Sequence, residues 1–282
     1  MAARQVAESI TGGTAMTRAI PRSLAPIVAA LELEGAEIVT ARDLERLLTA
    51  NGIKTETKVV AKRLRDLGWL LRTHQPGAWE FAPGAHAGPI GHGNPFRDVA
   101  AAIAASPTLD ASLCLTSALW AHGLLDRAPD RPVVAVRPNA AVPRALSAAV
   151  RVVRFDWYLR PTLVRGTPTH RAATILVHLA AKPSDVTSWG GVLDVLHDLI
   201  DRVDRDELEE ELTPRPAAVK TRLAYLVEGV APRLALEVAE PRHGKVWFGP
   251  RGPLKRHHQR LGVADTILPR APLSLTREPR PR

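Results

Sequence analysis

Three short stretches of helical periodicity, followed by a hairpin pattern, occupy residues 20–82 and constrain the fold more than any other feature of the sequence. The first stretch starts near Arg22 and ends at Gly35, and its apolar residues share one helix face: Leu24, Ile27, Val28 and Leu31. Short helices are stable mainly through the packing of such a face against other elements. We therefore expect this region to form a small domain with its own core.

The second helix has clear signals at both ends. It follows an extended piece at 37–39, and Thr40 with Asp43 three residues later forms a capping box in which Asp replaces the usual Glu. Asn51 and Gly52 come after the apolar stripe, which consists of Leu44, Leu47 and Leu48. Both residues tolerate the left-handed conformation that ends many helices, so a tight turn is expected here.

The third helix, predicted over 55–67, carries opposite kinds of side chain on its two faces. At about 100° per residue, Lys62 and Arg65 fall within about 40° of Lys58. Lys54 joins them if the helix extends back that far. The far side of the helix is apolar and holds Val60, Leu64 and Leu67.

A β-hairpin is predicted after Gly68. Two runs rich in aromatic and apolar residues, at 69–74 and 78–82, are joined by Gln75-Pro76-Gly77, which supplies turn chemistry. Three helices followed by a hairpin is the element order of a winged helix-turn-helix.

The charges of this region favour binding to DNA. Between residues 51 and 75, six Lys or Arg face only two acids. A helix enters the major groove when its exposed face carries donors and its other face is held by supporting helices. The predicted DNA-contacting residues are Lys54, Thr55, Thr57, Lys58, Lys62, Arg65, Arg72 and His74. The alternatives are a merely solvated amphipathic face and a winged helix that binds only protein.

The whole chain is basic, with 282 residues, a formal net charge of +9 and a pI of about 10.4. Such a surface attracts polyanions, although Arg-rich codon usage is an alternative source of the charge. The single cysteine, Cys114, lies in an apolar run, which predicts a buried thiol in a reducing cytoplasm. Neither a membrane span nor a secretory signal is evident, so a cytoplasmic protein without membrane contact is expected.

A larger domain of mixed α/β type is predicted over 96–270, so the fold class is α+β. Helices are expected at 96–105, 115–125, 172–181, 189–203, from about 206, and at 217–230. Strands are expected at 132–136, 150–155, 162–165 and 245–248, in an order that stays open. The remaining segments are a flexible lead-in at 1–19, a Gly/Pro/His-rich linker at 83–95 and a flexible tail at 271–282.

No catalytic residue, metal site or cofactor is predicted. His86 and His92 lie in the linker without a nearby Cys or acidic partner, and are interpreted as loop histidines. His122 and His178 lack the histidine four residues away that a metalloprotease helix carries, and Ser117 lacks the glycine elbow of a hydrolase nucleophile. A nucleic-acid-processing enzyme such as a nuclease is kept as the alternative from another class.

Two charged segments of the larger domain have more than one interpretation. Residues 201–211 hold seven acids with Arg202 and Arg205, and are either a solvated helix face or a contact for a basic partner. Residues 242–260 hold six Lys or Arg and no acid. They track nucleic-acid phosphates, face a protein partner, or form a solvated loop. The possible second basic surface consists of Lys245, Arg251, Lys255, Arg256 and Arg260.

Several strings of the sequence are typical of one bacterial family. They are KRLRDLGWLL at 62–71, WEFAPG at 79–84, LTSALWAHGL at 115–124, ATILVHL at 173–179 and KVWFGP at 245–250. With these strings the chain resembles, over roughly residues 20–270, the AbiEi-type antitoxins of type IV toxin–antitoxin systems, in the actinobacterial branch with a long C-terminal domain.

The resemblance implies a repressor that binds inverted repeats of double-stranded DNA in the promoter of its own operon. It also implies that the C-terminal domain counteracts a nucleotidyltransferase-like toxin. No motif identifies the residues that contact a toxin. The alternative within the regulatory class is a winged-helix regulator of other genes without an antitoxin role.

Overall fold

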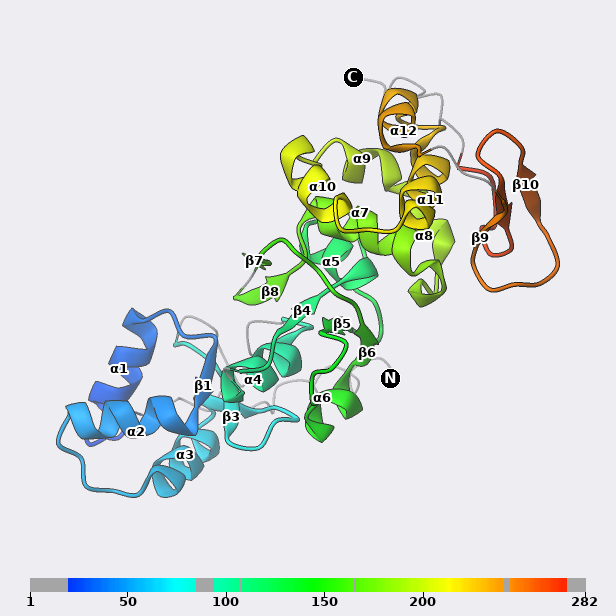
Figure 1. Ribbon diagram of the computed structural model, residues 1–282. Coiled ribbons are helices and arrows are strands. Elements are labelled where there is room, and N and C mark those ends of the chain that lie inside the picture. Colours follow the sequence, from blue (N-terminus) through cyan, green and yellow to red (C-terminus); the bar gives the residue numbers. More distant parts are fainter. Residues whose placement is uncertain (1–19, 85–93, 107, 165, 241–243, 273–282) are drawn as a thin grey trace, which may run out of the picture. The chain divides into compact units, whose positions relative to one another are not determined.

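The computed structural model describes residues 20–84, 94–106, 108–164, 166–240 and 244–272 (Figure 1). The lead-in 1–19, the linker histidines His86 and His92, and nearly all of the tail 271–282 lie outside the described residues. The fold is α+β, as predicted, and divides into a first unit that ends at Ser106 and a second unit from Pro107. Among the described helices, none combines the length and the apolar character that crossing a membrane requires.

Three helices begin the first unit, and their ends follow the sequence signals. They are α1 (Ala25–Leu33), α2 (Ala41–Ala50) and α3 (Thr57–Asp66). The capping box is confirmed, because the Asp43 amide donates to the Thr40 hydroxyl at 3.2 Å and the Thr40 amide donates to Asp43 Oδ2 at 2.9 Å. Gly52 follows α2 with a φ of +65°, a conformation that carries no Cβ penalty in glycine.

A small antiparallel sheet completes the expected part of the first unit. Its strands are β1 (Ile38–Thr40), β2 (Leu70–Arg72) and β3 (Ala78–Phe81), in the order β1-β3-β2. Strands β2 and β3 form the predicted hairpin, with Gly77 in its turn at a φ of +75°. Helices and sheet share one core, which includes Ile27, Leu31, Leu44, Val60, Leu64 and Phe81.

Helix α4 (Arg97–Ala105) also belongs to the first unit, which corrects the predicted start of the larger domain at residue 96. It packs against β1 and β3, and Phe96 and Val99 are buried there. Arg97 Nη1 lies 3.4 Å from the carboxylate of Glu80, a buried residue of β3. An apolar stripe shows that a helix needs a core, but it does not show which of two cores the helix joins.

A five-stranded mixed sheet forms one part of the second unit. Its order is β6-β5-β4-β8-β7, and the strands are β4 (Ala111–Leu113), β5 (Val133–Val136), β6 (Arg151–Arg154), β7 (Thr162–Val164) and β8 (Thr167–Thr169). β4 pairs antiparallel with β5 and parallel with β8, while β5 pairs parallel with β6 and β7 antiparallel with β8. Strands β5, β6 and β7 fall within predicted segments. The sequence does not predict β4 and β8, because three residues are too few to show alternation.

The central helix of the second unit is α7 (Ala172–Ala181), in which every residue from Ala173 to Ala180 is buried. The others are α5 (Leu115–Ala121), α6 (Arg144–Ala149), α8 (Trp189–Asp194), α9 (Leu196–Ile200), α10 (Arg205–Leu212), α11 (Ala217–Val227), α12 (Pro232–Val238) and a 3-10 turn, η1 (Pro183–Asp185). Helix α7 packs against α5, α9, α10 and α11.

Two helix predictions of the second unit need correction. The helix predicted over 115–125 ends at Ala121, because Gly123 takes a φ of +72°. The helix predicted over 189–203 is divided into α8 and α9 at Val195, whose ψ of 4° departs from helical geometry. The sequence does not predict α6 and α12.

The last described segment forms a separate sheet of order β10-β11-β9. Its strands are β9 (Val246–Phe248), β10 (Arg256–His258) and β11 (Val263–Asp265). β9 lies within the predicted strand 245–248, and the sheet packs on α11. Phe248 and Val263 are buried in the main core of the second unit, so this segment is part of the folded unit.

Candidate nucleic-acid interface

Helix α3 and the turn before it hold six of the predicted DNA-contacting residues, and the helix starts later than predicted. Lys54 and Thr55 lie in the turn between α2 and α3, and Thr57 is the first residue of α3. Glu56 takes an extended ψ of 136°, which ends the possibility of a helix that runs back to Lys54. The angular position calculated for Lys54 therefore does not apply, but its side chain is exposed next to the helix N-terminus.

The two faces of α3 are separated as predicted. Val60, Ala61 and Leu64 are buried in the core of the first unit. Lys58 and Lys62 are exposed, whereas Arg65 is half-buried and its Nε makes no hydrogen bond with a described residue. The charged face is therefore centred on the two lysines. Arg63, which the sequence prediction left out, is exposed on the same helix.

Both lysines of α3 have carboxylates beside them. Lys58 Nζ lies 3.0 Å from Glu56 Oε2, and Lys62 Nζ lies 2.7 Å from Asp66 Oδ2. The hydrogen bond from Lys62 lowers the pKa of Asp66, which keeps that carboxylate charged. Exposed pairs of this kind contribute little to stability, so they are easily exchanged for another anion.

The hairpin carries one exposed basic residue and one that is anchored. Arg72 lies at the end of β2 and is exposed, and it makes no ion pair with any described residue. His74 is held by Asp98 of α4, which accepts from the His74 amide at 2.7 Å and lies 2.8 Å from its Nδ1. His74 therefore connects the hairpin to α4, and its contact with DNA phosphate stays a prediction.

Three of the five residues of the predicted second basic surface bind partners inside the second unit. Arg256 Nη1 donates to Asp265 Oδ2 at 2.8 Å and to the Leu268 carbonyl at 3.0 Å. Arg260 pairs with Glu228, and Lys255 Nζ donates to the Ile267 carbonyl at 3.0 Å. These cations hold the C-terminal sheet together, which corrects the interpretation of 242–260 as a solvated loop.

Lys245 and Arg251 remain from that surface as exposed cations. Neither makes an ion pair with a residue in the described part of the chain, and Lys245 Nζ lies 5.5 Å from the centre of the Trp247 ring. Arg242 lies outside the described residues. Only these two of the five predicted residues are exposed without a hydrogen-bond or ion-pair partner among the described residues. The role of this surface in binding nucleic acid or protein stays a prediction.

Arg256 is therefore expected to matter for stability rather than for binding. Asp265 is buried and also accepts from the Tyr225 hydroxyl at 3.0 Å, and burial, ahead of the Asp265 charge, raises the pKa of that hydroxyl. An R256A variant leaves the carboxylate without its cation and should lose about 1.5–3 kcal/mol of unfolding free energy, measured by urea denaturation. The exposed R251A variant is the control, and equal midpoints for both variants would contradict this role.

The acids of segment 201–211 have different roles. Neither a solvated helix face nor a contact for a basic partner describes all of them. Asp204 caps α10, because its Oδ1 accepts from the amides of Asp206 and Glu207 at 3.0 and 3.1 Å. Glu211 is fully buried. Contact with a basic partner stays a prediction for the acids of this helix that are exposed, namely Asp206, Glu209 and Glu210.

The polar residues weighed as catalytic candidates have structural partners. The Ser117 hydroxyl accepts from the Val133 amide at 2.7 Å, and His122 Nε2 lies 2.8 Å from the His170 carbonyl. Cys114 is a free, buried cysteine, and burial raises the pKa of its thiol well above the ordinary value. The predicted buried thiol is thus confirmed, and a raised pKa disfavours the nucleophilic thiolate.

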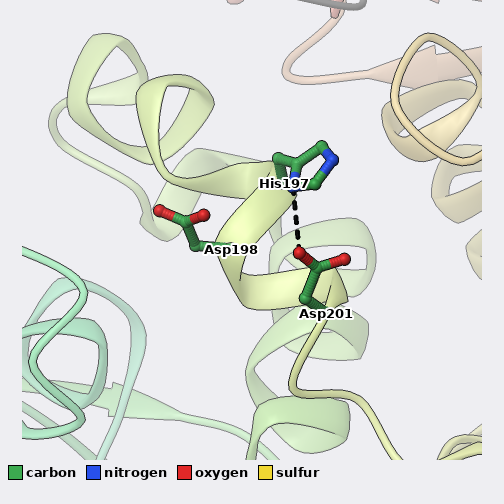
Figure 2. A group of neighbouring side chains, drawn as sticks. All are labelled: His197, Asp198 and Asp201. Carbon is green, nitrogen blue, oxygen red and sulfur yellow. Dashed lines mark ion pairs between the residues drawn. The ribbon is translucent and has the colours of Figure 1, made fainter. Parts of the chain in front are cut away.

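One group that sequence reasoning missed lies at α9, where His197, Asp198 and Asp201 are neighbours (Figure 2). One ligand atom from each residue lies within 4.8 Å of the others. Ligands of a tetrahedral zinc ion with bonds of about 2.0–2.1 Å are separated by only about 3.3 Å, so this group is more open than such a site. His197 Nδ1 already pairs with Asp201 Oδ2 at 3.1 Å, and the four-residue spacing is the signal that predicts this pair.

Comparisons with known proteins show what part of the second unit is similar to. Residues 111–229 match the family model described as the AbiEi antitoxin C-terminal domain. The crystal structure of the RV2827C protein from Mycobacterium tuberculosis is similar in fold, with a TM-score of 0.70 and 26% sequence identity over 91% of this chain and 95% of that chain. No curated protein matched. The resemblance to AbiEi-type antitoxins is therefore confirmed, and residues 111–229 of the second unit are similar to the AbiEi antitoxin C-terminal domain.

Proposed function

We propose that this chain is a DNA-binding autorepressor and antitoxin. In this proposal the first unit is a winged helix-turn-helix that binds inverted repeats in its own promoter, and the second unit counteracts a nucleotidyltransferase-like toxin. The AbiEi antitoxin domain supports an antitoxin or transcription-regulator role in a toxin–antitoxin system. The observation that carries the DNA-binding half is the exposed basic face of α3 opposite a face buried in the core.

The arrangement of the first unit suits groove binding for a physical reason. Helix α3 is held by its buried face, so its exposed face presents Lys58 and Lys62 without rearrangement of the backbone, and Arg63 is exposed elsewhere on the same helix. Lys54 and Thr55 precede the N-terminus of α3, where free amide groups also attract phosphate. Arg72 on the hairpin supplies a cation on a neighbouring element, as a wing does when it contacts the DNA backbone.

The carboxylates beside the lysines reduce the local charge but do not block the face. A phosphate that approaches Lys62 replaces the carboxylate of Asp66, and the exposed pair that it breaks contributes little. Release of condensed counterions from DNA then favours binding and makes it dependent on salt. Removal of Asp66 by D66N should therefore strengthen DNA binding, whereas removal of Lys62 should weaken it.

The DNA-binding half is tested by fluorescence anisotropy titrations of the upstream promoter fragment at several salt concentrations. We expect the K58A and K62A variants, and more so the double variant, to bind more weakly, with a log–log salt slope reduced by about one unit per lost phosphate contact. The control is R233A, which removes an exposed cation from α12 of the second unit, where no DNA contact is proposed. Unchanged affinity and slope in the folded double variant would exclude α3 as the groove-binding helix.

The antitoxin half is tested with the full chain in cells that express the downstream toxin gene. The K58A/K62A variant should still rescue growth, although it no longer represses its promoter, because rescue is assigned to the second unit. A regulator of other genes without an antitoxin role would not rescue growth even as the wild-type chain. Loss of rescue in a folded variant that has lost only DNA binding would contradict the division into two functions.

A further inference from the structure

A pocket in the second unit is lined by residues to which the proposed function assigns no individual role. Its volume is about 420 Å³, and it lies between the first turn of α5, strands β5 and β6, the loop from α5 to β5, and the start of α8. All of these segments belong to the second unit and to the described residues. Ligand pockets for small molecules have volumes of about 300–1,000 Å³, so a small molecule fits this space.

The charge of the pocket is positive. Arg127, Arg131 and Arg151 line it, and Asp130 is the acid among its lining residues. Arg127 and Asp130 lie 3.4 Å apart with side chains that are 88% and 91% exposed, and such a pair holds its partners only weakly. The pocket therefore offers an excess of cations to a ligand.

Two of the three guanidinium groups have no carboxylate partner among the described residues. Arg131 Nη2 donates to the Ser147 carbonyl at 3.0 Å, and Arg151 Nη2 donates to the Asp185 carbonyl. A guanidinium has five N–H donors, so each group keeps donors for another acceptor. Its planar fork matches the oxygens of phosphate, which it binds through two parallel hydrogen bonds.

The rest of the lining supplies hydroxyls and apolar side chains. Thr116, Thr187 and Ser188 also line the pocket, and their hydroxyls make no hydrogen bond with a described residue, so they are available as uncharged donors. Apolar atoms form most of the remaining wall and include those of Val133 and Val192, both buried residues. The pocket therefore combines cations and hydroxyls, which attract an anion, with apolar atoms, which accommodate an apolar group.

We propose that this pocket binds a mononucleotide, with its phosphate on Arg131 and Arg151 and its base against the apolar wall. A free inorganic anion would leave the apolar wall in water, and a nucleic-acid strand needs an open groove that follows its backbone. The pocket has the volume of a small-molecule site and is lined by arginines, hydroxyl-bearing residues and apolar side chains. This combination favours a single nucleotide.

The test is isothermal titration calorimetry of the full chain with AMP, GMP, CMP and UMP, with adenosine, with inorganic phosphate, and with a single-stranded oligonucleotide. At least one mononucleotide should bind, adenosine should not bind, and inorganic phosphate should bind more weakly than the nucleotide. The R131M variant should weaken nucleotide binding about tenfold or more, because it removes charge-assisted hydrogen bonds. The matched control is R233M, an exposed arginine on α12 that does not line the pocket.

Arg151 supplies a second, independent variant. R151M should also weaken nucleotide binding, and its thermal unfolding midpoint without ligand shows whether the second unit still folds. A nucleotide should raise the midpoint of the wild type and of R233M but not of R131M. The proposal is overturned if no mononucleotide binds, if phosphate binds as tightly as the nucleotide, if R131M binds like the wild type, or if only the oligonucleotide binds.

Discussion

Replacing Glu211 with alanine is expected to lower the unfolding free energy of the second unit by about 3–5 kcal/mol, because it leaves a nearly buried guanidinium without its partner. Glu211 and Arg215 form an ion pair at 2.9 Å with side chains that are 0% and 9% exposed. A folded domain is stable by only about 5–15 kcal/mol. The substitution therefore removes a large part of the total unfolding free energy of the domain.

The cost is high because Glu211 satisfies several groups at once. Its Oε1 accepts from the amides of Tyr158 and Leu159 at 2.9 and 3.0 Å and from the Thr174 hydroxyl at 2.9 Å. These bonds join α10 to α7 and to the segment after β6. Arg215 lies over the rings of Phe155 and Tyr158, 4.7 Å from the centre of each, so it cannot move into water without loss of packing.

Urea denaturation of the full chain, followed by far-UV circular dichroism, measures this effect. The control is E209A, an exposed acid on the same helix, which should change the unfolding free energy by no more than about 0.5 kcal/mol. The double variant E211L/R215M should lose less than E211A, because both members of the pair are replaced by apolar groups. If E211A and E209A unfold at the same urea concentration, the buried pair does not have the role assigned to it.

Lowering the pH below about 6.5 is expected to destabilise the second unit through His170 and His178. Both side chains are fully buried, and burial is the main cause of their lowered pKa values. Unfolding returns each imidazole toward its ordinary pKa of 6.5. The unfolded chain therefore binds more protons below that pH, so stability is fully present above it and is lost as the pH falls, by up to about 1.4 kcal/mol per pH unit for each histidine.

The surroundings of the two histidines agree with this direction. His178 is stacked on Phe155 with ring centres 3.8 Å apart, and its Nε2 lies 3.6 Å from Asp185 Oδ2. Asp185 favours the protonated form of His178, but burial outweighs it. The charges of Arg137 and Arg215, and of the neighbouring His178, add to the lowering of the His170 pKa.

Urea denaturation at a series of pH values between about 7.5 and about 5 tests this pH dependence. The H170F and H178F variants should each reduce the slope of unfolding free energy against pH below about 6.5. The surface variant H257Q, on β10, is the control and should leave the slope unchanged. A slope that is the same in all four proteins would show that the acid sensitivity has another origin.

The two faces of α3 could be predicted from the sequence, because they depend only on the spacing of residues along one helix. The opposition of Lys58 and Lys62 to Val60 and Leu64 follows from the helical repeat, and burial in the structure agrees with it. The partners of the basic residues were not readable in the same way. Asp98 meets His74 from 24 residues away, and such contacts have no local signal.

The same limit explains why the basic segment 242–260 was interpreted too simply. Its charge is evident in the sequence, but Arg256 reaches Asp265 and Arg260 reaches Glu228 only because β10 and β11 form a sheet on α11. Strands of three residues carry no alternation from which that sheet could be predicted. Arg256 and Arg260 were therefore counted as surface cations, although each of them forms an ion pair inside the second unit.

By itself, the sequence determined the helices of the first unit, their caps and turns, and the two faces of α3, since these depend on residues within one or two helical turns. The family strings also predicted the similarity to AbiEi-type antitoxins, which the match at residues 111–229 confirms. Only the tertiary structure decided that α4 joins the first unit, how the five strands are ordered, and which charges are paired. Each of these depends on contacts between distant segments, whose free energy is gained only when the core forms.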